Sequence, residues 1–297
     1  MLNNNLIYDE YKIIKNKIIF NDNFNDGIEN YINIISDRSF NIIVFGKRFN
    51  KSLNNLPENI KELYLGRDYN YLLLSIPISI RNIIFATDSS YYHSLDNLPN
   101  SVEKIVLSDN YNTKINMLPF NLKYLILGKS YSHKIMFPIN LKYLDIGKSY
   151  KDTLDNLPSN LETLILGGFF NNYINYSPKL KNLIIKEGCL YNNSIEFLPS
   201  SLEYLELKNN YTLRILDLPE SIKCISLGNY YIGNIITFPE NLQKLILSDR
   251  FNYEFESLPE SLKIIELYDN HSYIKYLNSI YPQIKLNIKK NNFFIFN

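Results

Sequence analysis

Tryptophan is absent from this 297-residue chain, cysteine occurs only twice, and neither sign of charge is in excess, since the formal net charge is +1. The even charge gives no electrostatic reason to expect nucleic acid or an anionic membrane as a partner. No run of about 18 apolar residues is present, so no membrane-spanning helix is expected. The first 14 residues also lack the apolar core and small-residue cleavage site of a signal peptide.

Motifs that carry enzyme or metal chemistry are missing as well. The histidines His93, His133 and His271 lie in separate segments, and none has a cysteine or carboxylate neighbour at metal-ligand spacing. No phosphate-binding loop, dinucleotide-binding glycine fingerprint, nucleophile elbow or zinc-protease motif occurs. We therefore expect no catalytic residues, no metal and no cofactor, and the protein is not predicted to be an enzyme.

The prolines reveal an internal repeat. Neighbouring prolines are 19 to 23 residues apart along the chain. The full set is Pro57, Pro77, Pro99, Pro119, Pro138, Pro158, Pro178, Pro199, Pro219, Pro239, Pro259 and Pro282. Such regular spacing identifies a repeat array, in which each unit buries its apolar face against its neighbours.

The segment Leu98–Pro119 shows the template when positions are counted from Pro99. Apolar residues fall at +3, +6 and +8, an aromatic residue at +12 and an asparagine at +13. Apolar side chains at +6 and +8, separated by a different residue, have the period of two that is typical of a strand. Each repeat is therefore predicted to hold one short strand at +5 to +9. A repeat of about 20 residues has no room for a helix as well, so its return segment should be extended or 3₁₀-like.

Two columns of residues should support the stack from inside. Aromatic rings at +12 should form a spine, either fully buried or reaching the solvent edge, because a buried tyrosine needs a partner for its hydroxyl. The asparagines behind the rings should hydrogen-bond the backbone of their own and adjacent turns. These asparagines are Asn25, Asn50, Asn70, Asn112, Asn171, Asn192 and Asn252.

Both ends depart from the template. Residues 1–14 are expected to form an N-terminal cap segment, residues 15–288 the solenoid, and residues 289–297 an apolar C-terminal cap tail. Apolar residues at helical spacing predict a short helix within Asp26–Ser36, with Asp26 as its cap. Four of the last five residues of the tail are phenylalanine or isoleucine. The tail should therefore fold under the last strand, which we favour, or pack on a second copy and make a homodimer.

The two cysteines, Cys189 and Cys224, lie two repeats apart. Neighbouring strands of a sheet are about 4.8 Å apart, so two steps separate the thiols by roughly 10 Å. A disulfide needs Cα atoms within about 7 Å, so none is expected. Unpaired thiols fit a reducing, intracellular compartment.

The repeat, written L-x-x-L-x-L-G-x-x-[FY]-N-x-x-I…L-P, resembles the FNIP-type leucine-rich repeat with its F-G-x-x-F-N motif. Phe45–Asn50 matches that motif in full, and Leu65–Asn70 and Leu166–Asn171 match it in part. The resemblance implies a repeat solenoid, a leucine-rich-repeat arc of about 13 or 14 units, with a parallel β-sheet on the concave face and little α-helix. The family occurs in large DNA viruses of protists and in social amoebae. For a viral chain, the expected location is the host cytoplasm.

The concave face is the surface most informative about function. Side chains at +5 and +7 should point to it, and the +7 row is mostly aliphatic. An exposed apolar patch usually marks a contact surface, although β-branched residues also suit exposed strands that have no partner. The candidate binding residues are Tyr124, Ile126, Tyr143, Asp145, Thr163, Ile165, Ile184 and Tyr204.

Three functions remain open at this stage. We favour a non-enzymatic protein–protein interaction module that binds a protein partner, such as a host protein, on its concave sheet. Members of the resembling family are often joined to an F-box, which implies a substrate receptor of a ubiquitin ligase, but no L-P-x-E-type opening is visible here. The third function is a self-associating structural protein. The carboxylates Asp145, Glu206 and Glu266 do not favour an enzyme, because strands three repeats apart are separated by roughly 14 Å.

Overall fold

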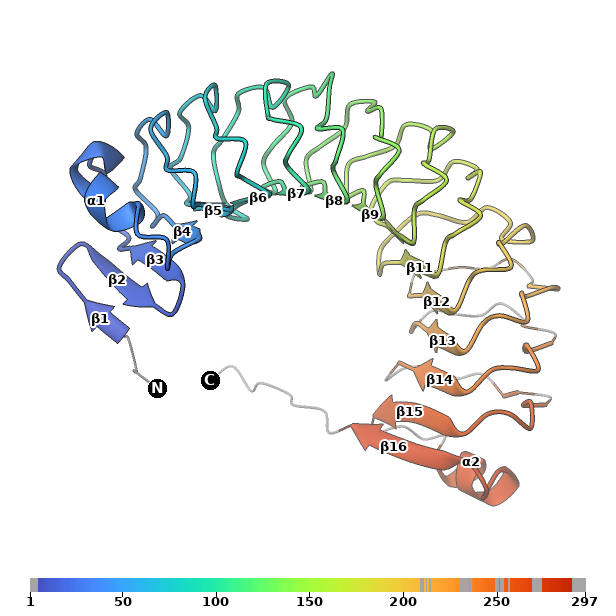
Figure 1. Ribbon diagram of the computed structural model, residues 1–297. Coiled ribbons are helices and arrows are strands. Elements are labelled where there is room, and N and C mark those ends of the chain that lie inside the picture. The colour runs from blue at the N-terminus through green and yellow to red at the C-terminus, as the bar shows by residue number, and fades with distance from the viewer. Residues whose placement is uncertain are drawn as a thin grey trace. The chain divides into compact units, whose positions relative to one another are not determined.

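Figure 1 shows the computed structural model of the chain. It describes residues 5–208, 211, 213, 215–229, 235, 237–248, 251, 254–255, 257–268 and 274–289. The chain divides into two compact units, Met1–Asp152 and Thr153–Asn297. Asn252, His271 and nearly all of the apolar tail discussed above, residues 290–297, lie outside the described residues.

The described strands of the first unit follow one another in chain order. β1 (Asn5–Ile7) and β2 (Tyr11–Ile14) pair antiparallel, and β2 pairs antiparallel with β3 (Lys17–Phe20). From β3 onward each strand pairs parallel with the next. The further strands are β4 (Ile42–Val44), β5 (Glu62–Leu65), β6 (Asn82–Phe85), β7 (Lys104–Val106), β8 (Tyr124–Ile126) and β9 (Tyr143–Asp145).

The second unit continues the same plan. Its described strands all pair parallel with their neighbours in chain order. They are β10 (Thr163–Leu166), β11 (Asn182–Ile185), β12 (Tyr204–Leu207), β13 (Cys224–Leu227), β14 (Lys244–Leu247), β15 (Ile264–Tyr268) and β16 (Lys285–Lys289). Within each unit the strands line the inner, concave side of the bend (Figure 1). The predicted solenoid with a parallel sheet on the concave face is confirmed.

Each strand divides its side chains between the core and the concave face. In the repeat around β7, Ile105 at +6 is 0% exposed and Leu107 at +8 is 3% exposed, whereas Lys104 and Val106 are half-buried. Successive strand residues point to opposite faces, so the +6 and +8 side chains fill the interior and the +5 and +7 side chains line the open face. The predicted period of two is thus confirmed.

The repeat is regular from β4 to β15, whose starts recur at eleven intervals of 19 to 22 residues. The return segments between these strands consist of turns and extended chain, and their described residues contain no helix. The prolines do more than favour an extended return, because most of them open a tight turn before the next strand. For example, the Val102 amide donates to the Pro99 carbonyl at 3.0 Å, and Leu122 donates to Pro119 at 3.0 Å.

The aromatic rings at +12 form a buried, stacked spine in each unit. Phe49, Tyr69 and Tyr91 are at most 2% exposed, and their ring centroids follow one another at 5.9 and 6.0 Å. In the second unit, Phe170 and Tyr191 stack at 6.1 Å. Of the two placements that the sequence left open, the rings therefore take the buried one.

Tyrosine can occupy the spine because the turns supply hydrogen-bond partners for several of the hydroxyls. Tyr111 donates to the carbonyl of His93 at 3.1 Å, and Tyr211 donates to the carbonyl of Asn193 at 3.1 Å. Burial raises the pKa of the Tyr111 hydroxyl well above its ordinary value, so it stays a neutral donor. A buried hydroxyl that keeps a hydrogen bond costs far less than one that is left without a partner.

The asparagine ladder is also present. The Asn25 side-chain oxygen accepts from the Asn50 amide at 2.8 Å, and the Asn50 oxygen accepts from the Asn70 amide at 3.0 Å. In the second unit, Asn171 accepts from the Asn192 amide at 2.9 Å. Each of these asparagines thus holds the backbone of the following turn, which confirms the predicted bonds between adjacent turns.

At the N-terminal end, β1 and β2 extend the sheet beyond β3. A helical segment follows, made of a 3₁₀ turn η1 (Ile28–Tyr31) and α1 (Ile32–Ile35). The predicted helix is therefore present, but the predicted Asp26 cap is wrong. Gly27 takes the cap position, no side chain forms a capping hydrogen bond there, and the Asp26 carboxylate accepts from the Gly27 amide at 3.2 Å.

At the C-terminal end, a second helix α2 (Ile274–Ile280) stands between β15 and β16. The sequence interpretation missed it and treated this segment as a drifting repeat. Leu277 is 0% exposed and Ile284 is 6% exposed, so the helix and the following turn cover the core beside the last strands. The proline-based register concealed the helical spacing of Ile274 and Leu277.

Candidate binding surface on the concave sheet

The concave face of the first unit carries a continuous row of side chains at position +7. Strand pairing places the members of the row side by side, from β4 to β8. All of them are half-buried. They are Val44, Tyr64, Ile84, Val106 and Ile126. Because the other face of each strand packs into the core, this apolar row stays open on the concave side.

A stacked aromatic pair lies beside the end of this row. Tyr124 and Tyr143 are paired across β8 and β9, and their ring centroids are 3.9 Å apart with planes at 10°. The Lys104 ammonium lies over the Tyr124 ring, 4.6 Å from its centroid. Burial, and next the hydrogen bond with Tyr124, raise the pKa of Tyr143 above its ordinary value. The pair therefore offers a rigid aromatic surface with a cation at its edge.

Asp145, the remaining candidate in the first unit, has a structural task. Its side chain is 6% exposed and accepts from the Gly147 amide at 3.0 Å. Gly147 has a φ of +69°, and a Cβ there would lie 2.3 Å from the Gly128 carbonyl oxygen. Asp145 thus supports the tight turn after β9 and offers little surface to a partner.

The other four candidates belong to the second unit. Thr163, Ile184 and Tyr204 are half-buried on the concave face, whereas Ile165 is only 6% exposed. The Thr163 hydroxyl accepts from the Asn182 side-chain amide at 3.0 Å. This face is more polar than the row in the first unit, because the charged residues Glu206 and Lys208 lie beside Tyr204.

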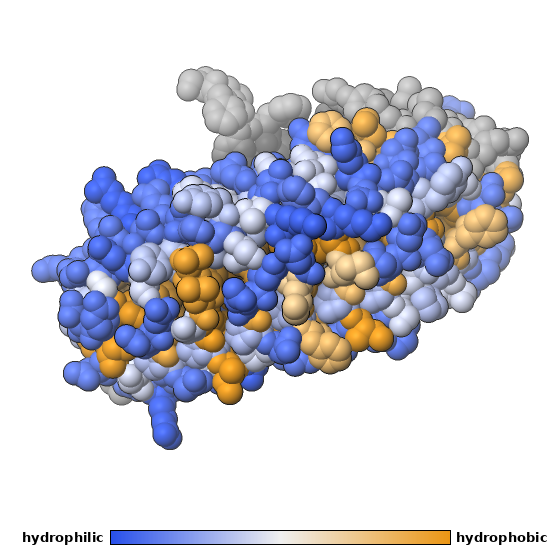
Figure 2. Space-filling model, turned by 90° about the horizontal axis from the view of Figure 1, so that it is seen from above, coloured by the Kyte–Doolittle hydropathy of each residue, from blue (hydrophilic) through white to orange (hydrophobic). Residues whose placement is uncertain are grey.

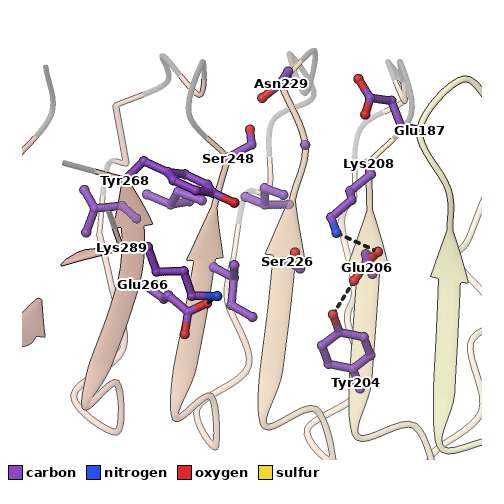
Figure 3. A pocket seen from close by; sticks show the side chains of 15 residues that line it. Glu187, Tyr204, Glu206, Lys208, Ser226, Asn229, Ser248, Glu266, Tyr268 and Lys289 are labelled. Carbon is purple, nitrogen blue, oxygen red and sulfur yellow. Dashed lines mark hydrogen bonds and ion pairs between the residues drawn. The ribbon is translucent and has the colours of Figure 1, made fainter. Parts of the chain in front are cut away.

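A pocket that the sequence did not reveal opens over β12 to β16 (Figure 3). Its volume is about 350 Å³. The Tyr204 hydroxyl donates to Glu206, which also pairs with Lys208 at 3.2 Å. Burial, and next this bond to Glu206, raise the pKa of Tyr204. The neighbouring strand, β13, contributes Ser226, which is 2% exposed.

The far side of the pocket is built around Glu266. This side chain is 6% exposed and pairs with Lys244 of β14 at 2.8 Å and with Lys289 of β16. Burial by itself would raise the pKa of Glu266, but the hydrogen bonds from the two lysines outweigh it and leave the pKa below its ordinary value. The carboxylate therefore stays charged and ties three strands together.

Sequence reasoning judged Glu206 and Glu266 only as a possible acid and base, and too far apart for that role. It treated position +9 only as the small residue of a tight bend, although Lys208 occupies that position in the repeat of β12. A long cation at a position that holds glycine in many repeats was the available signal.

The return loops of the first unit, seen in Figure 2, show apolar side chains among polar ones. Met117 is 66% exposed in the loop between β7 and β8, and Met136 is 65% exposed between β8 and β9. Within the described part of the chain, no group of three or more potential metal ligands gathers. None of the helices described is long and apolar enough to cross a membrane.

These stacked strands, the ring spine and the asparagine ladder define a leucine-rich-repeat solenoid. Comparison with family models identifies FNIP repeats at residues 49–88, 93–130, 131–169 and 232–270, which together cover just over half of the chain. The chain therefore belongs to the FNIP-repeat family.

Comparison with solved structures found CroV588, described as a novel circular leucine-rich-repeat protein. It is 28% identical, with a TM-score of 0.67 over 88% of this chain, and the chain spans 38% of its length. YopM from Yersinia enterocolitica is 17% identical, with a TM-score of 0.41 over 78% of this chain and 70% of its own. The comparison with curated proteins gave no match. Repeat folds of this type are typical of protein-interaction modules and are generally non-enzymatic scaffolds.

Proposed function

We propose that the chain is a non-enzymatic interaction module that binds a protein partner on the concave sheet of its first unit. The observation that carries the proposal is the stacked pair of Tyr124 and Tyr143, half-buried beside the apolar row that ends at Ile126. Tyrosines with a fixed orientation and an apolar border have the composition of a binding hot spot. Such rings contribute a large contact area and lose little conformational entropy on binding.

The chemistry of the surface supports a partner of a particular kind. An apolar segment of the partner would cover Ile84, Val106 and Ile126, and an aromatic or aliphatic side chain would pack on the tyrosine pair. Lys104 keeps its ammonium over Tyr124, so a partner carboxylate placed there would gain an ion pair beside the rings. The expected partner surface is therefore apolar with an acidic residue at its margin, as a host protein could present.

Sheet stability is the competing explanation for the same residues. Cross-strand aromatic pairs contribute about 0.2–1 kcal/mol to a sheet without any partner, and valine and isoleucine suit strands. This explanation predicts that removing the rings lowers stability slightly and changes no binding event. The two explanations therefore differ in a measurable way.

The test is affinity purification from the native host cell with the wild-type chain and the double variant Tyr124→Ala, Tyr143→Ala. The variant should fold, by circular dichroism and melting temperature, and should lose the captured partner. The matched control is Met117→Ala, Met136→Ala, which removes two large exposed side chains from the loops on either side of β8. The control should retain the partner. Unchanged capture by the tyrosine variant would show that the partner binds elsewhere.

The same preparation tests the other functions that the sequence left open. A ubiquitin-ligase receptor should co-purify with a Skp-like adaptor, and a self-associating protein should show a multiple of the monomer mass in light scattering. The two cysteines, Cys189 and Cys224, are free thiols, which supports the reducing interior of a cell as the place of action. For a viral chain this would be the host cytoplasm.

A further inference from the structure

The pocket of the second unit has the size of a small-molecule site, and its walls combine two tyrosines with charged and polar side chains. Its volume of about 350 Å³ lies within the range of about 300–1,000 Å³ of such sites, near its lower limit, which suits a ligand of one ring. Tyr204 on β12 and Tyr268 on β15 lie on opposite sides of it, with Ser226 and Ile246 on the two strands between them (Figure 3). Each tyrosine presents an apolar ring face and a polar hydroxyl.

The formal charges around the pocket sum to zero, because three carboxylates, Glu187, Glu206 and Glu266, are matched by three lysines. Glu206 is held by Lys208 at 3.2 Å, and Glu266 is held by Lys244 at 2.8 Å and by Lys289. A ligand with a net charge would have to separate one of these pairs or lie beside a like charge. Removing the partner of a poorly solvated charge is costly, so the arrangement disfavours both cations and anions.

Hydrogen-bonding capacity nevertheless remains. Each carboxylate can accept about four hydrogen bonds and each ammonium can donate three, which is more than the ion pairs use. The Ser248 hydroxyl is buried and has no partner within the described part of the chain. The Tyr268 hydroxyl points toward the pocket (Figure 3). A buried hydroxyl without a partner at a cavity is the kind of group that a ligand satisfies.

We propose that this pocket binds a neutral, polyhydroxylated ligand of the size of a single sugar ring. A hydroxyl donates and accepts at once, so such a ring can donate to Glu206 and Glu266 and accept from Lys208 and Lys289 while the ion pairs stay intact. Hydrogen bonds to ionised groups are the stronger kind. The apolar C–H face of the ring packs on Tyr268.

The first experiment is saturation-transfer NMR of the full chain with a panel of sugars. The neutral probes are glucose, galactose, mannose and N-acetylglucosamine, and the charged probes of the same ring size are glucosamine and glucuronate. At least one neutral sugar should bind saturably and more tightly than both charged rings. No saturable binding of any neutral sugar up to tens of millimolar overturns the proposal, and so does tighter binding of a charged ring.

The second experiment locates the sugar with variants. Glu206→Gln should weaken binding of the best neutral sugar about tenfold, because it replaces a charged acceptor by a neutral one. The matched control is Glu62→Gln, since Glu62 accepts from the Tyr64 hydroxyl at 3.3 Å on the concave face of the first unit. Binding should be unchanged in the control.

Ser248→Ala is the second variant, and it removes only the buried hydroxyl that lacks a partner. It should fold and weaken binding several-fold. Full binding by both Glu206→Gln and Ser248→Ala, or an equal loss in the Glu62→Gln control, overturns the proposal. The result is independent of the partner test on Tyr124 and Tyr143, which belong to the first unit.

Discussion

Replacing Phe170 by alanine should cost the protein about 3–5 kcal/mol of unfolding free energy, the usual range for a phenylalanine removed from a core. The ring is 0% exposed and stacks on Tyr191 with centroids 6.1 Å apart and planes at 11°. Because the ring is fully enclosed, its removal would leave a cavity in the core. The stacking itself adds about 0.5–1.5 kcal/mol beyond burial, which favours the upper half of the range.

The neighbouring residue provides a matched control. Phe169 is the same residue type, one position earlier, but 52% exposed. Phe169→Ala should change the stability by less than about 1 kcal/mol, since exposed substitutions rarely exceed about 0.5 kcal/mol. Both variants replace phenylalanine by alanine, at adjacent positions of the chain. The difference between their unfolding free energies therefore measures the effect of burial.

The assay is equilibrium unfolding in urea, followed by circular dichroism, with both variants and the wild type under identical conditions. Repeat arrays can unfold in parts. The urea midpoints of two proteins are therefore compared only where the dependence of the unfolding free energy on urea concentration is the same in both. A loss below about 1 kcal/mol for Phe170→Ala, or equal losses for the two variants, would refute the buried spine.

Two further predictions concern the ladder and the last strands. Asn50→Ala removes the acceptor of the Asn70 amide and should cost about 1 kcal/mol of unfolding free energy, measured in urea. Asn54→Ala, an exposed change in the same repeat, should leave the stability nearly unchanged. Equal losses for the two variants would contradict the asparagine ladder. The folded-state pKa of Glu266 lies below its ordinary value of 4.5, so its stabilising contribution is present above that pH and is lost as the pH falls through the lower folded value. Glu266→Gln should therefore lower the melting temperature at neutral pH and reduce the fall in melting temperature on acidification. The exposed change Glu260→Gln should do neither. Parallel pH profiles of the melting temperature for Glu266→Gln and wild type would contradict the ion pairs of Glu266 with Lys244 and Lys289.

Much of the interior could be predicted from residue types alone. The apolar pair at +6 and +8 and the rings at +12 recur along the regular turns, the prolines recur from Pro57 onward, and asparagine follows the ring in many of the turns. In a solenoid, residues at the same position of successive repeats lie side by side, so a residue type that recurs in the sequence forms a row in the structure. That is why the spine of Phe49, Tyr69 and Tyr91 and the ladder of Asn25, Asn50 and Asn70 follow directly from spacing.

The ends and the concave face were less accessible to such reasoning. α2 was missed because its segment occurs once and a proline at nearly the expected spacing suggested another repeat. The Asp26 cap failed because the precise first residue of a short helix depends on backbone angles that spacing does not report. Asp145 was expected on an open surface, but the turn at Gly147 draws its carboxylate inward.

Residue order by itself therefore determined the solenoid, its parallel sheet and its buried columns, because those features depend on one periodic pattern that stacking repeats. Only the tertiary structure decided that Tyr124 and Tyr143 stack at 3.9 Å and that Glu266 is held between Lys244 and Lys289. These contacts join single, non-repeated residues of neighbouring turns, and their geometry depends on side-chain rotamers. Periodicity places such residues on neighbouring strands but carries no information about rotamers, so the contacts within the candidate binding surfaces become visible only once the turns are stacked.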